Sequence, residues 1–123
     1  MKYLILIHSN PQSRAVWESF GSEEQQAGYE LYGGISAELE ASGELIVAEA
    51  LADPSTGKRV TNVNGAVSTM DGPYAEVKEL VNGFYLVDCV DLDRAVEIAA
   101  GFPEAAFGLI EIRPVMSLSD IGL

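Results

Sequence analysis

The sequence contains a single cysteine and few basic residues. Cys89 has no partner for an internal disulfide, and its place in an apolar run suits a reduced, buried thiol. Seven lysines and arginines stand against 19 acidic residues, which gives a net charge of -12. Contacts with nucleic acid phosphates or an anionic membrane surface require clustered basic residues. The charge balance therefore argues against both partners.

Several functional signatures are also missing. His8, the only histidine, and Cys89 are far apart and do not form a zinc site, and no glycine-rich loop has the spacing of a phosphate or dinucleotide site. We therefore expect no metal and no cofactor. The apolar run over 3–7 is too short to span a bilayer, and no small-residue cleavage site follows it, which predicts a cytoplasmic protein.

Apolar and amphipathic segments alternate along the chain, whose 123 residues are the usual length of one domain. A helical turn is expected over 12–20, and Ser22 and Gln25 have the spacing of a capping box at the start of the next helix. The apolar spacing predicts two longer helices, over 22–42 and 92–100, the second capped by Asp91. Strands are expected over 2–9, 44–51, 84–90 and 109–115.

A β-hairpin is predicted between the second and third of these strands. Asn64-Gly65 is a strong signal for a two-residue hairpin turn. This turn makes Val63 face Ala66, Thr61 face Ser68, and Lys58 face Asp71. Neither face of the hairpin is strongly apolar, so we expect it to project from the sheet or to lie at its edge.

The order of elements is that of a split βαβ, or ferredoxin-like, α+β fold with an inserted β-hairpin. We expect one domain over 1–116 and a C-terminal tail over 117–123. Right-handed crossovers place both helices on one face of the sheet, yet the strands over 2–9 and 84–90 are apolar on both sides. The bare face should therefore pack on a second copy in a homodimer that encloses a cleft. The alternative is a monomer whose hairpin folds over that face.

One candidate site follows the hairpin, at Asp71-Gly72-Pro73-Tyr74. Gly72 is expected to provide backbone angles closed to other residues, and Pro73 fixes φ. Asp71 can act as a base or bind a polar group of a substrate, and Tyr74 can line the cleft. A turn-capping Asp71, or one paired with Lys58, explains the same residues without a catalytic role.

A second group of polar residues interrupts the apolar strands. His8 ends the first strand, and histidine is the natural acid–base group near neutral pH. Glu111 and Arg113 share one face of the last strand, which lies beside the first in this fold. Glu111 can therefore approach His8 on the open face. A Glu111–Arg113 pair, or an ion pair at the dimer interface, is the structural alternative.

The residues over 71–79, with Gly83-Phe84-Tyr85 and the two chain ends over 1–7 and 110–115, resemble the YCII-related family, in the branch named for an Asp-Gly-Pro-Phe motif. Tyr74 stands where that motif has phenylalanine. The resemblance implies a dimeric α+β-barrel and no particular reaction. Some relatives are suspected of His-Asp acid–base chemistry, and members are often encoded beside alternative sigma factors.

Two functional hypotheses follow. In the first, the homodimer binds or transforms a small organic molecule in its cleft, with Asp71 and His8 as catalytic residues and Tyr74, Glu111 and Arg113 as substrate-binding residues. In the second, the chain is a non-enzymatic regulatory or interaction module, linked to an alternative sigma factor, and the hairpin or a strand edge contacts the partner.

Overall fold

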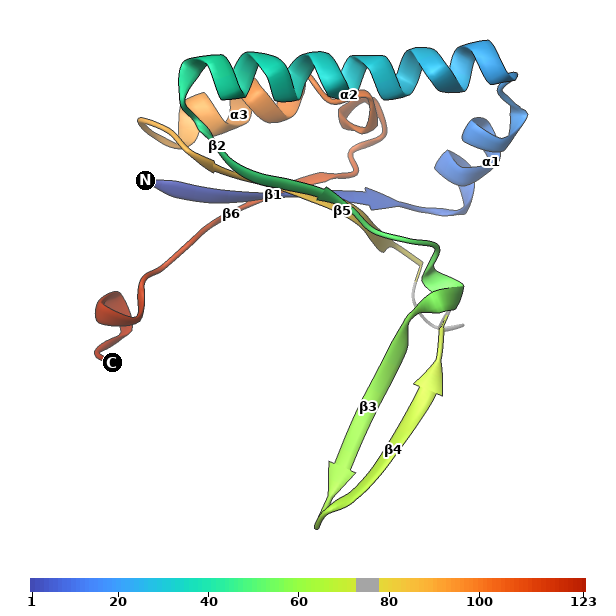
Figure 1. Cartoon of the computed structure of the whole chain (residues 1–123), viewed down its shortest axis with the longest axis vertical. Helices are drawn as coiled ribbons and strands as arrows, with labels where there is room; N and C mark the ends of the chain where they lie inside the picture. The colour runs from blue at the N-terminus through green and yellow to red at the C-terminus, as the bar shows by residue number, and fades with distance from the viewer. Residues whose placement is uncertain (73–77) are drawn as a thin grey trace.

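The computed structural model describes residues 1–72 and 78–123 (Figure 1). Four antiparallel strands form one sheet in the order β2-β5-β1-β6, which is the expected ferredoxin-like arrangement. Its strands are β1 (Lys2–Ser9), β2 (Leu45–Ala50), β5 (Leu80–Asp88) and β6 (Ile110–Pro114). The helices are α1 (Pro11–Ser19), α2 (Ser22–Ser42) and α3 (Leu92–Ala100), with short 3-10 turns η1 (Pro54–Thr56), η2 (Pro103–Phe107) and η3 (Leu118–Ile121).

The sheet has one face covered by helices and one face without them. Figure 1 shows α2 and α3 lying over the same side of the sheet. Because side chains alternate along a strand, Ile5 and Ile7 of β1 point into the helix-covered core, whereas Leu4 and Leu6 point to the other side and are partly exposed. The core is completed by the buried side chains of Tyr85, Val87, Ala95, Ile98 and Phe102.

The helix ends follow the expected chemistry with one correction. Asp91 caps α3 as predicted, because its carboxylate accepts a hydrogen bond from the Arg94 backbone N–H at 2.9 Å. The predicted cap Ser22 is wrong by one residue: the extended residue before α2 is Gly21, whose N–H donates to the Glu24 carboxylate at 3.3 Å. Gly21 takes the cap position because Ser22 is already helical.

Strands β3 (Lys58–Val63) and β4 (Ala66–Asp71) form the predicted hairpin, separate from the main sheet. All three predicted pairs are confirmed, from Val63 with Ala66 at the turn to Lys58 with Asp71 at the base. Asn64 and Gly65 both have positive φ, at 53° and 85°, as a two-residue turn of this kind requires. Figure 1 shows the hairpin projecting from the sheet on the side opposite the helices.

The third expected strand is longer than predicted at its start. β5 begins at Leu80 rather than at Phe84, because the end of β1 continues to pair beyond a bulge after Ile7, so that His8 lies opposite Val81. Within the described residues, no helix is both long and apolar enough to cross a membrane.

Candidate functional site

The structure brings His8 and Glu111 together on the face of the sheet that no helix of the described residues covers. His8 Nε2 lies 3.1 Å from Glu111 Oε1. The expected approach of Glu111 to His8 is thus confirmed. His8 alternates with the buried Ile7 and Ser9 on β1, and Glu111 pairs with Leu6 on the neighbouring strand β6, so both side chains project from the same face.

The pairing determines which nitrogen of His8 carries the proton. An ionised carboxylate only accepts hydrogen bonds, so a neutral His8 donates to Glu111 from Nε2 and keeps its lone pair on Nδ1. The Nδ1 atom is buried and has no hydrogen-bond partner among the described residues. The side chain of Glu111 is 50% exposed and that of His8 only 18%. Glu111 is therefore the member of the pair that is more accessible to solvent.

Apolar side chains lie beside this pair, and Arg113 lies farther away. Leu4 and Leu6 of β1 share the face of His8 and are partly exposed. Arg113 pairs with Leu4, whereas Glu111 pairs with Leu6, so Arg113 lies one step farther along the sheet from His8. Arg113 remains a predicted substrate-binding residue, on the same face but not next to the imidazole.

Asp71 belongs to a second charged pair, at the base of the hairpin. Its Oδ1 atom lies 2.5 Å from Lys58 Nζ, and both side chains are more than half exposed. The cross-strand pair that we considered as the structural alternative is therefore present. An exposed ion pair of this kind contributes little to stability. The catalytic role of Asp71 stays a prediction.

Gly72 is needed because there is no room for a side chain at this position, and not because of its backbone angles. This corrects the sequence prediction. Its φ does not lie in the left-handed region. A Cβ atom at this position would lie 2.3 Å from the carbonyl oxygen of Pro54, and the Gly72 N–H donates to the Gly57 carbonyl at 3.0 Å. Gly72 therefore allows the end of β4 to pack directly against the η1 turn.

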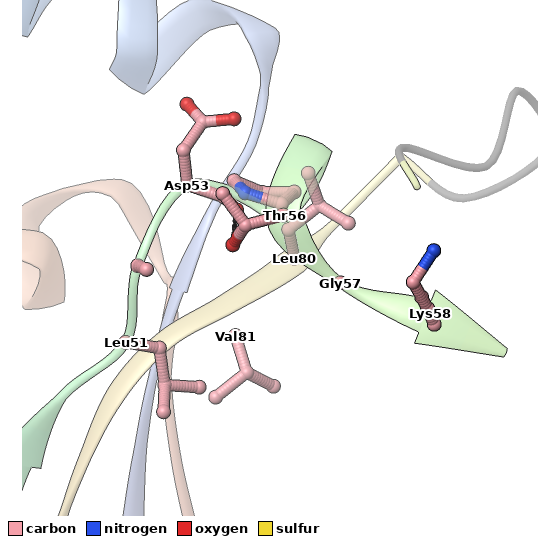
Figure 2. Close-up of a pocket in the computed structure, with 9 residues that line it drawn as sticks. Leu51, Asp53, Thr56, Gly57, Lys58, Leu80 and Val81 are labelled. Atoms are coloured by element: carbon pink, nitrogen blue, oxygen red, sulfur yellow. Dashed lines mark hydrogen bonds between the residues drawn. The ribbon is translucent and has the colours of Figure 1, made fainter. Parts of the chain in front are cut away.

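A pocket of about 330 Å³ lies beside this turn, at the end of the sheet where β2 stops and β5 begins (Figure 2). Lys58 stands at its edge, and Val81 forms part of its wall. Val81 is also the β5 residue paired with His8, so the pocket and the His8–Glu111 pair lie at the same end of the strands. The remaining lining residues are Leu51, Ala52, Asp53, Pro54, Thr56, Gly57 and Leu80.

Asp53 is the acidic residue in the wall of this pocket. Hydrogen bonds from Ser55, including one from its backbone N–H at 2.9 Å, hold the pKa of the Asp53 carboxyl below its ordinary value. Asp53 therefore stays ionised at neutral pH. Its carboxylate points away from Leu51 and Val81 in Figure 2, and Lys58 at the edge of the pocket is paired with Asp71.

A family model for the YCII-related domain matches residues 1–119. The chain belongs to the YCII-related domain family. An uncharacterised protein of Rhizobium meliloti (strain 1021) is 28% identical over 117 residues, which cover 94% of this YCII-related chain and 92% of that protein. A 5-chloro-2-hydroxyhydroquinone dehydrochlorinase from Burkholderia phenoliruptrix AC1100, solved with 2,5-dihydroxybenzoquinone, is 15% identical with a TM-score of 0.48, and the match covers 94% of each chain.

Two parts of the site lay beyond the sequence prediction. Tyr74 of the YCII-related motif falls in 73–77, outside the described residues, so its place in the cleft stays a prediction. The pocket residues Leu51, Asp53 and Val81 were missed. Asp53-Pro54-Ser55 follows the second predicted strand, and no sequence pattern indicated that this segment folds beside the start of β5. Within the described residues, no three potential metal ligands cluster together.

Proposed function

We propose that this YCII-related chain binds and transforms a small organic molecule by acid–base chemistry. The observation that carries the proposal is the pairing of Glu111 with His8 on the open sheet face, at 3.1 Å, next to partly exposed leucines. A few polar groups that converge beside apolar walls are typical of small-molecule sites.

The two residues have distinct roles in this proposal. Glu111, which is half exposed, accepts a proton from an acidic O–H or C–H group of the substrate, and the proton returns from Glu111 to the product. His8 holds the carboxylate in place through its Nε2–H, which donates a hydrogen bond to it. The pocket at the same end of the sheet receives the rest of the molecule, with Lys58 and Asp71 at its edge.

A second copy of the chain completes the cleft in this proposal. Leu4 and Leu6 of β1 and Phe84 and Leu86 of β5 are partly exposed on the uncovered face. A continuous apolar patch of this kind is unusual on a soluble monomer and marks an interaction surface. A homodimer related by a two-fold axis covers both sheets and encloses His8 and Glu111 in an apolar space.

The test is a ligand screen by thermal shift with small phenols, hydroxy acids and diketones. A hit should bind Glu111→Gln at least tenfold more weakly than the wild type, whereas Glu38→Gln, a matched change on an exposed position of α2, should bind equally well. Isothermal titration would measure both affinities. Equal affinity for Glu111→Gln, or no compound that binds the wild type, would contradict the proposal.

An interaction module is the second candidate, because the hairpin displays exposed valines, and exposed apolar residues that cluster mark a contact surface. It includes the predicted link to an alternative sigma factor. This candidate predicts that Glu111→Gln leaves function in cells unchanged, while polar substitutions in the hairpin abolish it. A comparison of the two variants in a deletion strain separates the candidates.

A further inference from the structure

The β3–β4 hairpin carries apolar side chains that its own sheet does not bury. Val60, Val63 and Val67 are 65%, 66% and 66% exposed. Among the described residues, β3 and β4 pair only with each other. A free two-stranded ribbon is marginally stable in water, and clustered exposed apolar residues mark a contact surface. The hairpin is therefore expected to gain its stability from a partner.

The apolar residues occupy both faces of the ribbon. The pairing of Asn62 with Val67 puts Val67 on the same face as Val60, whereas Val63 lies with Ala66 on the other face. A ribbon that rests on a flat surface needs only one apolar face. A ribbon with valines on both faces fits a groove whose two walls contact both sides.

The direction and length of the hairpin point to a second copy of the same chain. Figure 1 shows it leaving the sheet on the uncovered side, where the proposed dimer partner lies. Strands of six residues reach about 20 Å at the usual rise per residue. Sheets that pack face to face are about 10 Å apart. The hairpin therefore passes the edge of the partner's sheet and reaches the level of its helices.

A suitable groove lies at the opposite edge of the sheet from the hairpin. It has a volume of about 200 Å³ between α3 and the edge strand β6. Its lining is apolar and consists of Val96, Ala99, Ala100, Ala105, Gly108, Ile110 and Ile112. Val96 is 51% exposed, so an apolar side chain that entered the groove would remove it from water.

The hairpin and the groove also lie at the same end of the strands. Ala50 pairs with Gly83, Gly83 with Ile7, and Ile7 with Ile110, so these residues form one row across the sheet. The hairpin starts beyond Ala50 at one end of this row, and the groove contains Ile110 at the other. A two-fold axis parallel to the strands brings the β2 edge of one copy over the β6 edge of the other.

We propose that the hairpin of each copy inserts Val60, Val63 and Val67 into the α3–β6 groove of the other copy. This inference rests on the homodimer of the proposed function and adds the contact that holds it together. By symmetry the dimer contains two such contacts, and each hairpin passes beside the open sheet face that carries the partner's acid–base pair.

The first test measures dimer affinity by analytical ultracentrifugation. Val60→Thr, Val63→Thr and Val67→Thr together keep the β-branched shape but add hydroxyl groups, and should raise the dimer dissociation constant at least tenfold. Val90→Thr, which changes a valine that is 80% exposed outside the hairpin, is the control and should not. An unchanged dissociation constant in the triple variant overturns the hairpin contact alone. A wild type that is monomeric throughout overturns the dimer as well.

The second test identifies the groove by cross-linking. Cys89 is the only cysteine and is buried, so introduced thiols react selectively. Copies with Val67→Cys are mixed with copies with Ala100→Cys and treated with a short bismaleimide. A heterodimer that forms only in the mixture supports the proposal. Cross-links between two Val67→Cys copies alone, or none in a protein that ultracentrifugation shows to be dimeric, would place the hairpin elsewhere.

Discussion

The two faces of the main sheet are built by the same strands and yet have opposite surroundings. On β1, Ile5 is fully buried under the helices, whereas its neighbours Leu4 and Leu6 remain partly exposed. Both sets are large and apolar, so hydrophobicity alone does not distinguish them. An apolar side chain on a strand thus indicates that its face of the sheet is buried in the functional state. The number and placement of the helices determine whether the chain buries that face itself or needs a partner to do so.

The largest effect is expected on the covered face. Ile5→Ala removes a side chain with no exposed surface and should lower the free energy of unfolding by about 4 kcal/mol. Urea denaturation followed by circular dichroism measures the change. This loss of unfolding free energy should be the same at low and high protein concentration, because only residues of the same chain contact Ile5.

A smaller effect is expected at the edge of the covered half, where Arg94 of α3 binds Glu44. The guanidinium donates to both oxygens of Glu44, at 2.8 and 2.9 Å, and lowers the pKa of this carboxyl from 4.5 to about 2. Because the folded pKa is depressed, the stabilisation is present above pH 4.5 and is lost as the pH falls toward 2. Glu44→Gln should cost about 2 kcal/mol at pH 7.

The pH dependence provides the control for this prediction. Urea titrations between pH 7 and pH 2.5 should show the difference between wild type and Glu44→Gln shrinking as the pH falls. A difference that stays constant over this range would show that shape at this position matters, and not the charge of the carboxylate.

The uncovered face should respond differently from the covered one. Leu6→Ala should cost only about 1 kcal/mol in dilute protein, because its side chain is already partly exposed there. The cost should grow at higher concentration, where a second copy buries the wild-type leucine. Urea denaturation at several concentrations measures both values, and a cost that does not depend on concentration would contradict a dimer through this face.

The smallest effect is expected at the base of the hairpin. Asp71→Asn removes an ion pair with Lys58 in which both side chains are largely exposed, so stability should fall by no more than about 0.5 kcal/mol. If the same variant loses binding to a compound that the wild type binds, Asp71 contributes to the site and not to the fold. Thermal shift with and without the compound separates the two contributions.

Most of the fold was predictable because its signals are local. The apolar run over 2–9, the turn at Asn64-Gly65 and the cap at Asp91 each depend on a few neighbouring residues, and each predicted element was confirmed. The cap of α2 was missed by one residue, because Gly21 with Glu24 can form the same type of contact as Ser22 with Gln25. When two neighbouring residues can both cap a helix, the sequence alone does not show which one does. The packing around the helix start determines the choice.

The site was only half predictable, for a different reason. His8 and Glu111 were matched because strand order fixes which residues of β1 and β6 share a face. The pocket depends on η1 folding beside the start of β5, a contact between segments about 25 residues apart that no periodicity records. The role of Gly72 was likewise hidden, because the oxygen that excludes a side chain there belongs to Pro54.

The tight fit at Gly72 has a consequence for partner recognition. The hairpin meets the rest of the chain at its base, where the glycine lies against the Pro54 carbonyl, and its tip lies about 20 Å away. A methyl group added at residue 72 would clash with this oxygen, so the base of the hairpin would have to shift and its tip would move with it. The orientation of the hairpin thus depends on the absence of a side chain at residue 72. A substitution there would redirect the hairpin without changing any residue of the groove that we propose it enters.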